Sequence, residues 1–165
     1  MKRLVALALI AAVAAAGWAW WHSDRRRIDR ALGRLERACE KDAPESPLAS
    51  VVRAGTLLDS FAPGLLVRAA PYGGTITDGR ELVGLIERYR ATASRIRISD
   101  EARRLEIGSN GSAEMSLVFR VDAVRSGGPG REAFRARLFW VRTDEGWRIR
   151  EIEVIEVLQT TGLFF

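Results

Sequence analysis

The sequence has few of the side chains on which most metal and nucleophilic sites depend. Its 165 residues include one cysteine and one histidine. A disulfide needs two cysteines, so a chain whose one cysteine is Cys39 has no intramolecular disulfide. Because His22 is the one histidine of the chain, a site built on several imidazole ligands is excluded. This residue also lies at the end of an apolar segment. We therefore expect no metal and no cofactor, and we assign no catalytic residue.

The part of the chain expected to fold also lacks an excess of charge. The formal net charge is +5, but residues 1–43 contain nine Lys or Arg against five Asp or Glu, whereas residues 44–165 contain seventeen against sixteen. Nucleic-acid binding needs a basic surface that contacts several phosphates. Nucleic acid is therefore not expected as a partner, and the basic N-terminal flank is expected to contact anionic membrane lipid.

What the sequence does contain is an uninterrupted apolar run from Leu4 to Trp21, preceded by Lys2 and Arg3. At about 1.5 Å of rise per residue, a helix of this length covers about 27 Å, close to the hydrocarbon thickness of a bilayer. Residues 1–23 are therefore predicted to form a transmembrane anchor. The alternative is a cleaved secretory signal, for which residues 14–16 supply the small side chains of a cleavage site.

Tryptophan and arginine residues at the end of this run favour the retained anchor, because tryptophan rings prefer the headgroup layer. The predicted membrane-interface residues are Trp18, Trp20, Trp21, Arg25, Arg26 and Arg27. A simple count of basic residues on the two sides places the domain in the cytoplasm. A short basic N-terminus before a first apolar segment is, however, the usual arrangement for export. We expect a single-pass membrane protein with its domain on the exported side.

The spacing of apolar residues after the anchor predicts three helices. Residues 24–43 are predicted to contain an amphipathic juxtamembrane helix, the first of the domain. A second helix is predicted to begin near Pro47. Its apolar side chains share one side: Leu48, Val51, Val52 and Leu58. A third is predicted to begin at Asp78, whose spacing to Glu81 is that of a capping box.

From Ser94 onward, apolar and polar residues alternate, which is the pattern of strands with one buried face. Asn110 and Gly111 predict a tight hairpin turn. Two strands are predicted to turn these residues inward: Met115, Leu117, Phe119 and Val121 on one, and Phe134, Ala136, Leu138 and Trp140 on the next. Residues 44–158 thus read as an α+β domain in which three helices pack on a curved antiparallel sheet, followed by an apolar tail, residues 159–165.

The order of these elements resembles the nuclear transport factor 2-like superfamily, also called cystatin-like or SnoaL-like, over about residues 28–158. The matching motifs are the helix start Asp78-Gly79-Arg80-Glu81 and the strand start Gly146-Trp147-Arg148-Ile149. The resemblance implies a cone in which a bent sheet wraps around helices and leaves a cavity at its open end. Members include ketosteroid isomerase-like enzymes, polyketide cyclases, dehydratases, ligand binders and non-catalytic assembly domains, so the fold does not choose among these functions.

Members similar to ketosteroid isomerase carry a general-base aspartate immediately before a proline, and the matching pair here is Ala70-Pro71. Tyr72 and Tyr89, the two tyrosines of the chain, do not match that family's oxyanion donors. We therefore expect a membrane-anchored, non-catalytic domain that forms a homodimer or binds a protein partner through its sheet face. The alternative is a small-molecule enzyme, or a binder of a small apolar, lipid-like ligand, that uses the cone.

The last strand supplies the candidate polar groups of such a cavity. With regular alternation, Glu151 and Glu153 share a face with Ile149 and point into the concave side, where Arg135 or Arg137 of the neighbouring strand would pair with them. A bulge near Glu151 would instead turn both carboxylates outward, into ordinary surface ion pairs. The sequence leaves both arrangements open.

Overall fold

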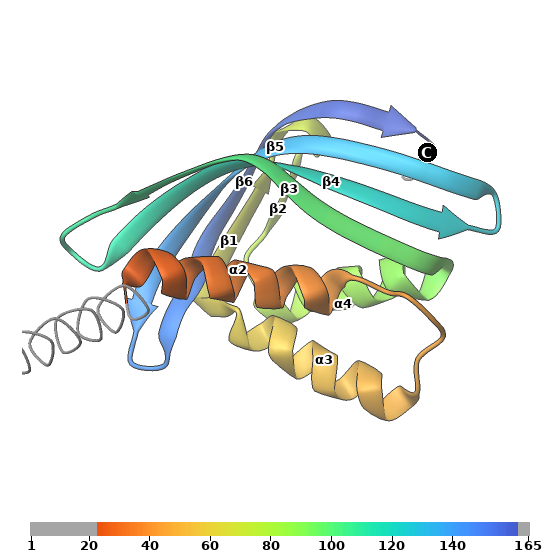
Figure 1. Ribbon diagram of the computed structural model, residues 1–165, viewed down its shortest axis with the longest axis horizontal. Helices are drawn as coiled ribbons and strands as arrows, with labels where there is room; N and C mark the ends of the chain where they lie inside the picture. Colours follow the sequence, from red (N-terminus) through yellow and green to blue (C-terminus); the bar gives the residue numbers. More distant parts are fainter. Residues whose placement is uncertain (1–22, 162–165) are drawn as a thin grey trace, which may run out of the picture.

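The computed structural model describes residues 23–161. Within that range the helices are α2 (Asp24–Cys39), α3 (Pro47–Asp59) and α4 (Gly79–Thr92). The strands are β1 (Phe61–Ala69), β2 (Gly74–Ile76), β3 (Ala93–Ile107), β4 (Ser112–Arg125), β5 (Gly128–Thr143) and β6 (Gly146–Thr161), and a short 3-10 turn (Ala70–Tyr72) follows β1. The helices lie together on one side of a strongly bent sheet (Figure 1).

The α+β architecture predicted from the sequence, with helices on a curved sheet, is confirmed, but the prediction of an antiparallel sheet is wrong. The strand order is β2-β1-β6-β5-β4-β3, and β6 runs parallel to β1 and antiparallel to β5. Alternation locates each strand without identifying its neighbours. One α-helix and four strands separate β1 from β6, which is ample chain for a parallel return.

Ser23 separates α2 from the segment that precedes it. Its backbone is extended, with φ −60° and ψ 144°, and its hydroxyl accepts a hydrogen bond from the backbone N–H of Arg26. The helix α2 therefore begins afresh at Asp24 with an N-cap. The predicted anchor and its tryptophans lie outside the described residues. Within residues 23–161, no helix has both the length and the apolar character needed to cross a membrane.

The first helix of the domain is shorter than the predicted segment 24–43, because it ends at Cys39. Lys41 leaves the helix and forms an isolated antiparallel bridge with Ile96. Its Nζ also donates to the carbonyls of Arg90 and Ala93, at 2.9 and 2.7 Å, which satisfies acceptors at the C-terminus of α4. These contacts join the end of α2 to α4 and β3.

The second helix turns its predicted apolar side away from the core. Leu57 is the buried residue of α3. The side chains predicted to share one side are exposed to 74, 69, 64 and 37 %: Leu48, Val51, Val52 and Leu58. The start of α4 follows the prediction, since Asp78 Oδ1 accepts from the N–H of Arg80 at 2.8 Å.

The predicted inward faces of β4 and β5 are confirmed. Met115, Leu117, Leu138 and Trp140 are at most 2 % exposed and belong to the main core, which also contains the buried face of α2. A second, smaller core of Ala93, Ile96 and Ala123 lies where β3 and β4 pair near the far ends of the strands. The strand β6 runs on to Thr161, so residues 159–161 belong to the sheet and not to a tail; residues 162–165 lie outside the described chain.

Candidate functional site

A cavity of about 320 Å³ lies between α4, the end of α2 and the concave face of the sheet. It is bounded by residues that pack on the main core and by residues of the smaller one. The apolar side chains of its wall are Leu82, Leu85, Ile86, Ile96, Ile98, Val121 and Phe134. The inward faces predicted for β4 and β5 form part of this wall, through Val121 and Phe134. The cavity is therefore the interior of the cone that the sequence resemblance implied.

Glu132 places a carboxyl group in this apolar wall. The residue is 1 % exposed, and neither carboxyl oxygen has a hydrogen-bond partner in the described chain. It lies on β5 two positions before Phe134, so the alternation of the strand turns both side chains to the same face. Burial raises the pKa of Glu132 to about 7, although the charge of Arg125 acts in the opposite direction. The carboxyl is thus partly protonated near neutral pH.

Tyr89 and Arg125 lie beside this carboxyl. The guanidinium carbon of Arg125 is 4.6 Å from the centre of the Tyr89 ring, which is cation–π geometry. Burial raises the pKa of the Tyr89 hydroxyl, and the nearby Arg125 opposes that shift. Tyr89 lines the cavity from α4. The wall therefore carries the carboxyl of Glu132 from β5 and the phenol of Tyr89 from α4, and the guanidinium of Arg125 lies next to the Tyr89 ring.

Cys39 also lines the cavity, but its thiol is not a reactive nucleophile. Burial raises the pKa of its thiol to about 12, so the thiolate that a nucleophile requires is scarce at neutral pH. Arg90 borders the same space with its guanidinium turned to the end of α2, where Nη1 donates to the carbonyl of Cys39 at 2.7 Å. These two residues form wall and not reactive groups.

The candidate residues of β6 and β5 lie elsewhere. Ile149 pairs with Trp140 and Glu151 pairs with Phe139, so β6 contains a bulge at Arg150 that reverses its alternation. Glu151 therefore faces outward with Phe139, on the side of the sheet that carries no helix. The structure has the bulged arrangement, which the sequence left open beside the regular one.

On that outer face the four predicted residues form ion pairs. Arg137 Nη2 is 2.7 Å from Glu153, and Arg135 Nη1 is 2.8 Å from Glu156. Glu151 pairs with Arg68 of β1 and borders a second hollow, which shares no lining residue with the cavity. The structure thus brings Glu153 and Arg137 together but places none of the four in the cavity wall.

Three of the predicted membrane-interface residues lie in the described part of the chain. Of the interface residues, Arg25, Arg26 and Arg27 form the first turn of α2, and Arg25 Nη2 donates to the carbonyl of Leu105 at 3.3 Å. Within residues 23–161, no three His, Cys, Asp or Glu side chains are grouped so that they could hold a metal ion.

Glu132 was missed from the sequence, although a signal for it exists. Stepping back two positions from Phe134 along the alternation places Glu132 on the inward face. An acidic residue close to the glycine-rich turn at residues 126–130 reads more naturally as the exposed end of a strand. Its burial depends on α4 covering this end of the sheet, which alternation does not reveal.

No protein-family model matches the sequence, and no curated protein sequence matches it. Solved structures do match. The Kfla4162 protein from Kribbella flavida superposes with a TM-score of 0.70 at 12 % identity, over 85 % of this chain and 94 % of that one. A hexachlorocyclohexane dehydrochlorinase, LinA type 2, gives 0.66 at 13 % identity, over 86 % and 91 %.

A protein of unknown function with a cystatin-like fold from Nostoc punctiforme gives a TM-score of 0.62 at 15 % identity, over 85 % of this chain and 95 % of that chain. Identities this low show the fold and not a shared activity. The structure and these matches agree with the motifs noted in the sequence. The chain has the cystatin-like fold of the nuclear transport factor 2-like superfamily.

Proposed function

We propose that the domain binds a small, mainly apolar molecule in the cavity, and that the Glu132 carboxyl contacts the polar group of that molecule. The observation that carries this proposal is the buried carboxyl without a hydrogen-bond partner. Leaving a buried polar group unpaired costs free energy, typically about 1–3 kcal/mol. A ligand that hydrogen-bonds to Glu132 recovers that cost, which gives the site both affinity and orientation.

The size and lining of the cavity support one class of ligand. Its volume of about 320 Å³ lies at the low end of the range for small-molecule sites. Its wall is almost entirely aliphatic and aromatic, and Glu132 and Tyr89 are among the few polar residues that line it. The matching ligand is a compact apolar body with one hydrogen-bonding group. This supports the ligand-binding alternative considered from the sequence over the assembly domain.

We further propose that residues 1–23 attach this domain to a membrane and that the domain lies on the exported side. The support is the length of the apolar run from Leu4 to Trp21 and the tryptophan and arginine residues that follow it. An apolar ligand concentrates in or near lipid, so attachment of the domain to a membrane fits a cavity of this lining.

A second function is favoured by the pKa of Glu132. A carboxyl that titrates near pH 7 exists in both protonation states at neutral pH, which is the condition for efficient general acid–base catalysis. The corresponding function is proton transfer to or from a bound apolar substrate. Glu132 would accept a proton from the substrate in one step and return it in the next.

Binding is tested with 2-naphthol, a compact apolar molecule with one hydroxyl, added to the full chain in detergent micelles. The wild type is expected to bind it saturably, and Ile86→Trp, which fills the cavity, is expected to abolish saturable binding. Glu132→Leu removes the polar contact and is expected to weaken binding about tenfold. Glu114→Leu on the outer face is the control, and partition into micelles is common to all variants. Unchanged binding by Ile86→Trp would contradict the proposal.

Glu132→Gln separates the two candidate functions. The amide keeps the size and hydrogen-bonding capacity of the side chain but does not titrate. A binding protein retains 2-naphthol affinity in this variant within a few fold. A proton-transfer enzyme retains the affinity and loses exchange of the proton between a bound carbon acid and solvent.

A further inference from the structure

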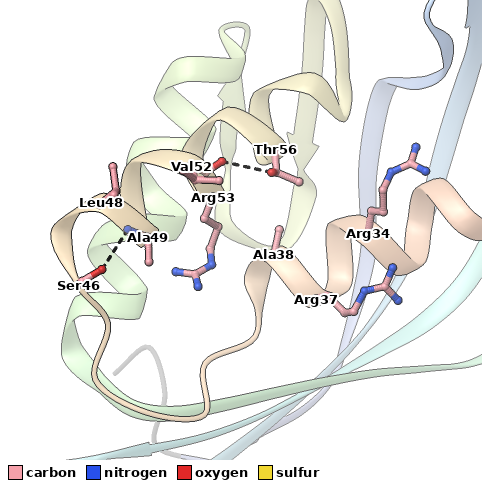
Figure 2. Close-up of a pocket in the computed structure, with 9 residues that line it drawn as sticks. All are labelled: Arg34, Arg37, Ala38, Ser46, Leu48, Ala49, Val52, Arg53 and Thr56. Atoms are coloured by element: carbon pink, nitrogen blue, oxygen red, sulfur yellow. Dashed lines mark hydrogen bonds between the residues drawn. The ribbon is translucent and has the colours of Figure 1, made fainter.

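The surface formed by α2 and α3 combines exposed apolar and basic side chains. An open groove of about 580 Å³ runs between the two helices, and the residues that line it include Arg34 and Arg37 of α2 and Leu48 and Val52 of α3 (Figure 2). The exposed fractions of Leu48, Val51 and Val52 are 74 %, 69 % and 64 %. Exposed apolar side chains gathered on one face commonly mark an interaction surface.

The charges of α2 are divided between its two sides. Its acidic residues bond towards the sheet: Asp24 accepts from Trp147 Nε1 at 3.1 Å, and Asp29 pairs with Arg103 at 2.9 Å. The third, Glu36, lies against Asp100 of β3. These carboxyl groups therefore contact residues of the sheet and do not neutralise the basic residues on the outer side of the helix.

The outer side of α2 is basic. Arg30, Arg34 and Arg37 are exposed and spaced by four and three residues, which places them along one helix face. Within the described chain, neither Arg34 nor Arg37 takes part in an ion pair. Leu48 and Val52 of α3 line the same groove as Arg34 and Arg37, and Val51, next to Val52 on that helix, is exposed as well. Together we call these six residues the α2–α3 face.

We propose that the α2–α3 face docks on a bilayer that contains anionic lipid, with the three apolar side chains in the headgroup region and the arginines on lipid phosphates. The proposal rests on the membrane attachment proposed above. The apolar run of the sequence ends at Trp21, two positions before the N-cap of α2 at Ser23. Because α2 starts afresh there, the helix is not required to continue the direction of an anchor and can lie along the surface.

The chemistry of the face selects this occupant. Apolar side chains flanked by arginines are the composition of interfacial helices, which combine burial of apolar area with attraction to anionic headgroups. A bilayer also presents a flat, extended surface, which suits two helices lying side by side better than it suits a closed pocket. A neutral protein partner would leave the charges of Arg34 and Arg37 uncompensated.

Docking is tested with the full chain in nanodiscs of phosphatidylcholine, with or without phosphatidylglycerol. Val52→Cys in a Cys39→Ala background carries an environment-sensitive fluorophore, and brominated lipid reports contact with acyl chains. With phosphatidylglycerol we expect a blue shift and quenching, both weakened by high salt. Arg120→Cys on the outer face of the sheet is the matched control and is expected to show neither.

Arg34→Glu combined with Arg37→Glu is expected to abolish the quenching at position 52. Persistence of the quenching in this double variant, or its absence from the labelled Val52→Cys protein with both arginines intact in anionic nanodiscs, overturns the proposal. A blue shift without quenching by brominated lipid means that a protein covers the face, which overturns it as well. Flotation of the chain with vesicles in high salt reports the attachment by residues 1–23 separately, so failure of the anchor is distinguished from failure of docking.

Discussion

Arg90 of α4 holds Glu45, in the connection between α2 and α3, by two hydrogen bonds from Nη2 at 2.8 and 2.7 Å. Its Nη1 donates to carbonyls at the end of α2, including that of Cys39. Arg90 is 2 % exposed and borders the cavity. One guanidinium therefore caps α2, positions the loop after it and fixes one wall of the site.

Arg90→Met is expected to lower the free energy of unfolding by about 2–3 kcal/mol, because several carbonyl groups and Glu45 lose their donor. Arg88→Met is the matched control, since Arg88 is exposed on the same helix, and a change within about 0.5 kcal/mol is expected there. Urea unfolding followed by far-UV circular dichroism measures both. Equal stability of the two variants would show that the Arg90 contacts do not hold the loop.

Glu132 is expected to make stability depend on pH. Its pKa is about 7 in the folded chain and 4.5 ordinarily, so between these values the folded state retains a proton that the unfolded state has released. Stability therefore falls as pH rises through this window, and the carboxylate costs about 3 kcal/mol above it. Glu132→Gln is expected to be more stable than the wild type at pH 8, with a difference that shrinks towards pH 5. A difference that is constant across this range would contradict the assignment.

Glu36, like Glu132, is expected to make the stability of the fold fall as pH rises. Burial and the neighbouring Asp100 raise the pKa of Glu36, while a hydrogen bond from Arg103 helps to hold the pKa of Asp100 down. The shared proton thus lies on Glu36, and stability falls as pH rises above the ordinary range of glutamate. Glu36→Gln keeps a donor towards Asp100 and is expected to flatten the pH profile of the melting temperature. An unaltered slope between pH 5 and pH 8 would count against it.

Asp24 joins the start of α2 to the start of β6 by accepting from Trp147 Nε1 at 3.1 Å. Asp24→Ala removes this bond and a carboxylate from the first turn of the helix, so a loss of about 1 kcal/mol is expected. Asp24→Asn keeps an acceptor and is expected to lose less. Thermal unfolding distinguishes the two variants, and identical melting temperatures would mean that the bond contributes little.

The sequence predicts the features that depend on local pattern. The inward faces that contain Met115 and Leu138 follow from alternation along one strand, and the start of α4 follows from the side chain of Asp78. Each of these features depends only on residues that are close together in the sequence. The overall cone was accessible because these local patterns occur in an order that resembles a known superfamily.

Features that depend on distant neighbours were not accessible. The parallel pairing of β6 with β1 joins strands far apart in the chain, and the bulge at Arg150 is a register shift against β5 that alternation along β6 alone does not reveal. The burial of Glu132 requires α4 to cover its end of the sheet. Leu48 is exposed because α3 turns Leu57 inward, which a stripe of apolar residues on the other side of the helix does not suggest.

The most direct test of the cavity as a ligand site is an NMR titration of the Glu132 carboxyl in the full chain, with and without 2-naphthol. The signal is assigned by its loss in Glu132→Gln. We expect a midpoint near pH 7 in the free protein, moved when the probe binds. A midpoint near 4.5 that 2-naphthol leaves unchanged would mean that the carboxyl is solvated and that the cavity does not hold such a ligand.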